Sequence, residues 1–125
     1  MDKDYYLDTS IWLDFFEKRG SNGEVALKLI NKVIEEDSII VYSDVVLREL
    51  KKLGYEQNDV IDIFRIAKPN NLRKVHISEK QLKEAKNLTS QRNLPEGDAL
   101  HAILVRDNHA RLITRDPDFD RLKDI

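Results

Sequence analysis

The sequence has 125 residues, enough for one domain of ordinary size. Lys and Arg number 21 and Asp and Glu 23, and the net charge of −2 excludes a protein that binds nucleic acid through bulk positive charge. The absence of cysteine excludes disulfides, zinc–thiolate sites and thiol nucleophiles. The sequence contains no signal peptide and no apolar stretch near the roughly 20 residues of a membrane span, so we expect a cytoplasmic protein.

The first half of the chain alternates short apolar runs with segments of helical periodicity. A strand at 5–7 ends at Asp8, which is followed by two more residues of types that favour helix N-termini. Apolar residues at helical spacing then predict one helix around 11–16 and a second one up to Glu35. The β-branched run 39–42 is the clearest strand, and it leads into a helix that Ser43 can cap and Gly54 ends.

The second half repeats this alternation. In order, it predicts a helix over 60–67, a half-exposed edge strand between Val75 and Ile77, a polar helix over 78–89, a largely buried helix that Asp98 caps or begins, a strand over 111–114, and a last helical turn from Asp116. Alternating strands and helices predict an α/β fold, a three-layer α/β/α sandwich with a small parallel sheet and right-handed crossovers. We expect a single domain over 1–125.

Three aspartates occupy similar places in this predicted fold. Asp8 follows the first strand, Asp116 follows the last strand, and Asp98 stands at the start of the buried helix. Residues just beyond the carboxyl ends of parallel strands meet at one edge of the sheet, where ligands bind. For each aspartate alone, helix capping is a sufficient explanation, because an Asp cap is worth roughly 0.5–2 kcal/mol relative to Ala.

Glu49 is not explained as a cap. Positions 46, 49, 50 and 53 are spaced i, i+3, i+4 and i+7, so Glu49 lies inside the apolar stripe of its helix. A buried carboxylate needs a positive partner, either a basic side chain or a metal ion. Together with the three aspartates it would form an all-oxygen site that favours Mg²⁺ or Mn²⁺, ions that serve phosphodiester hydrolysis.

Four motifs surround these acids, in the order LDTSIW (7–12), VVLREL (45–50), GDALHA (97–102) and LITRDPDF (112–119). As an ordered set they resemble the PIN-domain ribonuclease family, and most of all its VapC toxin branch. The resemblance covers essentially the whole chain. It implies that Asp8, Glu49, Asp98 and Asp116 are the catalytic residues and bind Mg²⁺ or Mn²⁺. It also implies the strand order 3-2-1-4, with a possible fifth strand.

The function that this resemblance implies is metal-dependent endonucleolytic cleavage of single-stranded RNA by water, leaving 5′-phosphate and 3′-hydroxyl ends. The implied partners are the RNA substrate, a small antitoxin protein and a second copy of the chain in a homodimer. One alternative keeps the same fold: a protein that processes RNA, or binds RNA or protein, outside a toxin–antitoxin pair.

The resemblance assigns supporting roles to the hydroxyls of Ser10 and Thr114, which are expected to hold water or a carboxylate at the site. Asp118, two residues after Asp116, could contribute in the same way.

Three further residues adjoin the predicted ligands. Arg48 and Arg115 are next to Glu49 and Asp116 in the sequence and are expected to contact flanking phosphates of the substrate. His101 lies one helical turn beyond Asp98. Two roles stay open for it, a partly buried structural histidine or a group that touches substrate or orients a carboxylate.

Overall fold

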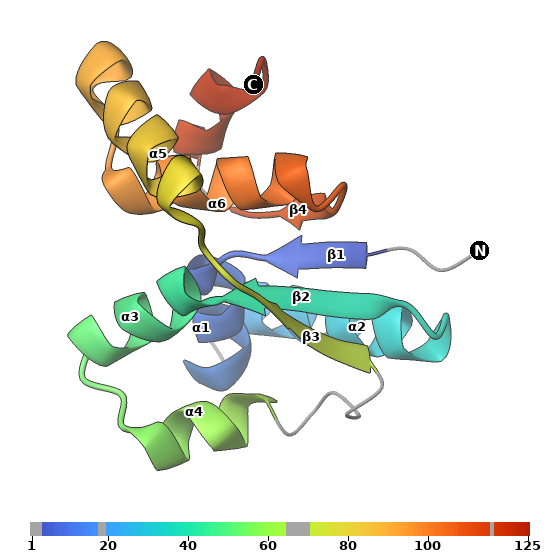
Figure 1. The fold of residues 1–125 in the computed structure, drawn as a ribbon. Coiled ribbons are helices and arrows are strands. Elements are labelled where there is room, and N and C mark those ends of the chain that lie inside the picture. Colours follow the sequence, from blue (N-terminus) through green and yellow to red (C-terminus); the bar gives the residue numbers. More distant parts are fainter. Residues whose placement is uncertain (1–3, 18–19, 65–70, 116) are drawn as a thin grey trace.

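A computed structural model describes residues 4–17, 20–64, 71–115 and 117–125 (Figure 1). The described strands form one sheet in the order β3-β2-β1-β4, and all neighbours pair in parallel. These strands are β1 (Asp4–Leu7), β2 (Ile39–Ser43), β3 (Leu72–Val75) and β4 (Arg111–Ile113). The helices are α1 (Thr9–Glu17), α2 (Gly20–Glu35), α3 (Asp44–Lys52), α4 (Gln57–Phe64), α5 (Glu79–Arg92), α6 (Glu96–Asp107) and the 3₁₀ helix η2 (Pro117–Leu122).

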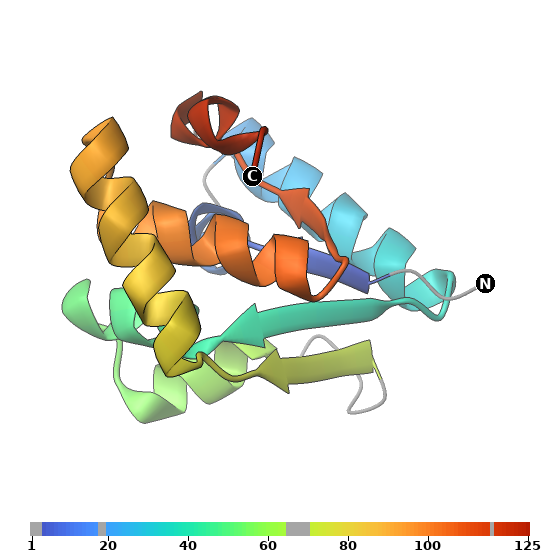
Figure 2. The same cartoon turned by 45° about the horizontal axis from the view of Figure 1, so that its top comes forward.

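Two apolar clusters lie on opposite faces of the sheet, because successive residues of a strand point to opposite sides. Tyr6 of β1 belongs to the cluster that contains α5, α6 and η2, whereas Leu7 belongs to the cluster with α1, α2 and α3. Figures 1 and 2 show α5 and α6 on one side of the sheet and α1, α2 and α4 on the other. The predicted three-layer sandwich and the strand order 3-2-1-4 are therefore confirmed.

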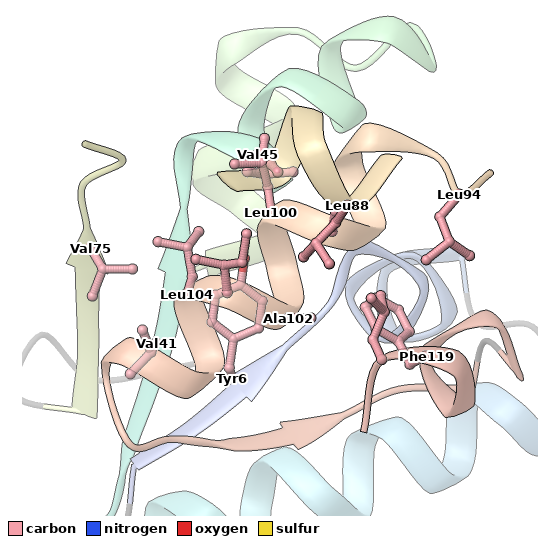
Figure 3. Packing of buried hydrophobic residues seen from close by; sticks show 14 residues of the cluster. Tyr6, Val41, Val45, Val75, Leu88, Leu94, Leu100, Ala102, Leu104 and Phe119 are labelled. Carbon is pink, nitrogen blue, oxygen red and sulfur yellow. The ribbon is translucent and has the colours of Figure 1, made fainter. Parts of the chain in front are cut away.

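Helix α6 is held by apolar contacts on several sides. Every residue from Ala99 to Leu104 is buried, because α6 packs on the sheet, on α5 and on η2. Figure 3 shows Tyr6 rising from β1 among Val41, Leu100 and Leu104. The expectation of a helix buried on most sides is confirmed, and this packing holds the helix that carries Asp98 in place.

Several element boundaries differ from the prediction. The third strand is Leu72–Val75, earlier than the predicted 75–77, although it does lie at the edge of the sheet. Only Val75 of this strand is buried, so its sequence carries little of the period-2 pattern that locates a strand. Helix α6 begins at Glu96, two residues before Asp98, because Pro95 with φ −59° already stands at its N-terminal cap position. Asp98 therefore does not cap it.

The fourth helix, predicted over 60–67, spans Gln57–Phe64, and residues 65–70 lie outside the described part of the chain. The described ranges hold four strands, without the possible fifth. No helix within those ranges combines the length and apolarity that crossing a membrane requires.

Candidate active site

Asp8 lies between β1 and α1 and is almost fully buried. Its backbone N–H donates to the Ile113 carbonyl of β4 at 3.2 Å, which holds the ends of the two central strands together. Its Oδ1 accepts hydrogen bonds from Ser10 Oγ at 2.6 Å and from the Ile11 N–H at 3.3 Å, and its Oδ2 accepts one from Thr114 Oγ1 at 2.6 Å. Asp8 is thus both the cap of α1 and a carboxylate oriented by three donors.

Glu49 lies on α3, and its carboxylate is joined to two other elements. Thr9 Oγ1 of α1 donates to Glu49 Oε1 at 3.1 Å, and His101 Nε2 of α6 contacts the same oxygen at 2.5 Å. The side chain of Glu49 keeps 36% of its surface exposed, whereas that of His101 keeps only 2%. The partner that the apolar stripe requires is therefore found in His101, for which the sequence left open a structural role or contact with a carboxylate.

Opposing influences act on the pKa of Glu49. Burial is the largest, and it raises this pKa. The hydrogen bond and charge of His101, the hydrogen bond from Thr9 and the charge of Lys52 together outweigh it, so the pKa of Glu49 lies below its ordinary value. Glu49 is therefore an ionised carboxylate at neutral pH.

The hydroxyl of Tyr6 shows that both acids lie in one neighbourhood. Burial is the main cause that raises the pKa of Tyr6, a hydrogen bond with Ser43 opposes it, and the negative charges of Glu49 and Asp8 raise it further. Both carboxylates therefore act on the pKa of the same phenol, although they come from different elements.

Gly97 brings α6 close to α3. A Cβ atom built at Gly97 would lie 3.6 Å from the carboxyl carbon and from both oxygens of Glu49. Half-buried Asp98 follows directly, so the third predicted ligand lies next to the residue that touches Glu49. A hollow of about 170 Å³ opens here, lined by Val45, Arg48, Glu49, Lys52, Glu96, Gly97 and Leu100.

Basic residues of α3 flank this hollow. Arg48 is exposed and lines both this hollow and a second one of about 460 Å³, which Lys51 also lines. Lys52 lines the first hollow and its charge lowers the pKa of Glu49, an influence that the sequence analysis missed. Its position three residues after Glu49, on a neighbouring part of the helix surface, was the available signal.

Arg115 holds a buried aspartate that was also missed. Its Nε and Nη2 donate to Asp14 Oδ2 and Oδ1 at 2.6 and 2.7 Å. The side chain of Asp14 is 1% exposed, whereas that of Arg115 is 42% exposed. A charged residue within the largely apolar segment 11–16 was the signal for such a partner.

The chemistry of the donor set fits a hard divalent cation, because Asp8 and Glu49 offer only oxygen and retain lone pairs beyond their hydrogen bonds. Asp116 and the side chain of Asp118 lie outside the described part of the chain. Among the side chains that are described, no three from His, Cys, Asp or Glu are grouped as they would be around a metal ion.

The model of the PIN domain family matches residues 5–125. The chain is similar in structure to VapBC2 from Rickettsia felis bound to a DNA fragment from their promoter, with 24% identity, coverage of 98% of this chain and 95% of that one, and a TM-score of 0.65. For Mycobacterium tuberculosis VapC20, a sarcin–ricin loop cleaving toxin, the identity is 17%, the coverage 95% of each chain and the TM-score 0.72. For a toxin–antitoxin complex from Klebsiella pneumoniae the identity is 22%, the coverage is 92% of this chain and 89% of that one, and the TM-score is 0.59. A search of curated protein sequences finds no match.

Proposed function

This chain belongs to the PIN domain family, and we propose that it is a Mg²⁺- or Mn²⁺-dependent endoribonuclease that cleaves single-stranded RNA. The observation that carries the proposal is that two carboxylates held by hydrogen bonds are linked through neighbouring residues: Thr9, which follows Asp8, donates to Glu49. Glu49 also lines a hollow flanked by basic residues. Carboxylates that are oriented by hydrogen bonds are suited to bind a hard cation, and basic side chains are suited to bind phosphates.

In this proposal Asp8, Glu49, Asp98 and Asp116 bind the metal and form the catalytic set. When bound, a divalent ion lowers the pKa of water and stabilises negative charge on the phosphate and the departing oxygen. Ser10 donates to one oxygen of the Asp8 carboxylate and Thr114, from near the other end of the sequence, donates to the second oxygen. Together they limit rotation of this carboxylate. We assign a similar supporting role to Asp118.

The substrate phosphates are assigned to the basic residues around the hollow. Arg48 and Lys52 flank Glu49 and can bind phosphates on either side of the cleaved bond. Arg115 binds Asp14 but keeps an exposed part of its side chain that can reach a flanking phosphate. With a net charge of −2, these local contacts matter more for RNA binding than the overall charge.

We further propose that the chain is the toxin of a toxin–antitoxin pair, that it is inhibited by a small antitoxin and that it forms a homodimer in the cytoplasm. The fold supports this, because the structures similar to it include a toxin–antitoxin complex. A PIN-fold protein that processes or binds RNA outside such a pair is the alternative. Growth arrest on expression, relieved by one co-expressed antitoxin, distinguishes the two.

A cleavage assay on single-stranded RNA tests the enzymatic proposal. We expect cleavage with Mg²⁺ or Mn²⁺, none with EDTA, and products with 5′-phosphate and 3′-hydroxyl ends. The same sequence in a duplex should be resistant. Cleavage that continues in EDTA would contradict metal dependence, and intact RNA with either metal would contradict the nuclease assignment.

Gly97→Ala should change stability and activity in opposite directions. Alanine is favoured over glycine by roughly 0.5–1 kcal/mol in the middle of a helix, and we expect a smaller gain at Gly97, the second residue of α6. The added Cβ would lie in ordinary van der Waals contact, 3.6 Å from the carboxylate of Glu49. The methyl group covers one approach to this carboxylate, so we expect metal-dependent cleavage to fall about tenfold, or about 1.4 kcal/mol. Urea unfolding and the RNA assay measure the two effects.

Asn87→Ala is the matched control for Gly97→Ala, because Asn87 is exposed on α5, away from the hollow. It should gain stability through helix propensity and cleave RNA at the wild-type rate. If Gly97→Ala cleaves RNA at the wild-type rate, access to the carboxylate of Glu49 past residue 97 is not needed for cleavage.

A further inference from the structure

Four side chains from different elements form one continuous hydrogen-bonded chain that ends on Glu49. Ser43 Oγ, at the N-terminus of α3, lies 2.7 Å from the hydroxyl of Tyr6 on β1. That hydroxyl lies 2.6 Å from Nδ1 of His101 on α6, and Nε2 of the same ring lies 2.5 Å from Glu49 Oε1. The hydrogen-bonded chain thus begins at the end of β2, passes through β1 and α6, and ends on α3.

The first three members of this hydrogen-bonded chain are enclosed, and only Glu49 reaches the surface. Tyr6 and Ser43 have no exposed surface, and His101 is 2% exposed. The ring of Tyr6 meets the ring of His101 edge-on, with ring centroids 5.4 Å apart. The ring of Phe119 also packs against the imidazole, with ring centroids 6.2 Å apart. A polar side chain in such a place costs free energy unless its hydrogen bonds are kept, so the imidazole has one favourable orientation.

The direction of the last hydrogen bond follows from the charge of Glu49. An ionised carboxylate only accepts hydrogen bonds, so Nε2 of His101 carries the proton and donates it to Oε1. Thr9 donates to the same oxygen. Within the described residues, both hydrogen bonds to this carboxylate end on Oε1, which leaves Oε2 available for a ligand.

We propose that His101 is a positioning residue, which holds Oε1 of Glu49 so that Oε2 can bind the metal. The inference rests on the proposed function, since it assigns a role within that site. Tyr6 keeps the imidazole in place by binding its other nitrogen, and Ser43 in turn binds the hydroxyl of Tyr6. Because Asp98 lies one helical turn before His101, the same contact sets the position of Asp98 relative to Glu49.

Two substitutions separate the donated hydrogen bond from the packing of the ring. The amide nitrogen of Gln reaches about as far from the backbone as Nε2 of His, so His101→Gln keeps a donor for Glu49. His101→Asn reaches only to the level of Nδ1 and loses that donor. We expect Mn²⁺ affinity, measured by calorimetry, to stay within about threefold in His101→Gln and to fall about 10–100-fold in His101→Asn.

The exposed His76 supplies the control, and His76→Gln should bind Mn²⁺ like the wild type. Circular dichroism and thermal unfolding of the metal-free proteins establish that both His101 variants are folded. Wild-type affinity in His101→Asn would overturn the proposal. Equal losses in folded His101→Gln and His101→Asn would also overturn it, because ring packing, not the donated hydrogen bond, would then matter.

A measurement without metal keeps this proposal separate from the proposed function. In ¹⁵N NMR spectra of the metal-free protein we expect Nε2 of His101 to carry a proton, with a resonance that shifts in Glu49→Gln. A bare Nε2 would overturn the positioning role. Failure of the wild-type protein to bind Mn²⁺ would instead contradict the proposed function, so the two failures are distinguishable.

Discussion

Asp8→Asn should reduce metal-dependent RNA cleavage by about 10³-fold or more while the metal-free protein keeps its fold. The substitution removes a charge from the proposed metal site, and metal coordination contributes several kcal/mol to the stabilisation of a phosphodiester-cleavage transition state. Asn caps a helix about as well as Asp, so its oxygen can still accept from Ile11 and Ser10. The hydroxyl of Thr114 can rotate to accept from the new amide, and the loss of stability should stay within about 1 kcal/mol.

Initial rates of RNA cleavage and urea unfolding in EDTA measure these two effects. Asp120→Asn is the matched control, because Asp120 is exposed and its ion pair with Lys123, at 3.0 Å, lies in water and contributes little to stability. It should cleave RNA at the wild-type rate. A folded Asp8→Asn variant with wild-type cleavage would show that Asp8 acts as a helix cap alone.

Arg115→Met should lower the free energy of unfolding by about 2–3 kcal/mol at neutral pH. The substitution removes two hydrogen bonds and a positive charge from Asp14, whose carboxylate is buried. Breaking a buried ion pair costs about 3–5 kcal/mol, and we expect less here because the guanidinium is partly exposed to water. Chemical unfolding of the purified variant measures the change.

A second substitution tests whether the loss of this ion pair at a buried carboxylate is the cause. Asp14→Leu combined with Arg115→Met removes the buried charge, so the double variant should be more stable than Arg115→Met alone. Arg92 makes a similar two-point contact with Asp124 at the surface, and Arg92→Met should leave the unfolding midpoint unchanged. A double variant no more stable than Arg115→Met would contradict the explanation.

Local sequence patterns predicted much of the fold. Ser78 begins α5 through a capping box, in which its hydroxyl accepts from the Gln81 N–H at 3.1 Å and the Gln81 side chain accepts from the Ser78 N–H at 2.9 Å. Gly54 follows the end of α3 with a φ of +96°, a conformation that glycine adopts readily. These signals involve residues a few positions apart in the sequence, so they can be recognised without a structure.

The candidate site was predictable only in part. The apolar stripe around Glu49 indicated that this carboxylate needs a partner, but nothing local identified His101, which lies on another helix. Asp14 lay in an apolar segment, yet its pairing with Arg115 depends on how α1 passes the end of β4. Burial requires that a charge be paired. It does not specify the partner.

Three features follow from the sequence: the order of strands and helices along the chain, the two faces of the sheet, and the need of buried acids for partners. They follow because they depend on periodicity and on the cost of burying charge. The folded chain adds the identity of those partners: hydroxyls from both ends of the chain on Asp8, and an imidazole from α6 on Glu49. A hydrogen bond needs its atoms within about 3 Å, and only the packing of separate elements sets such distances.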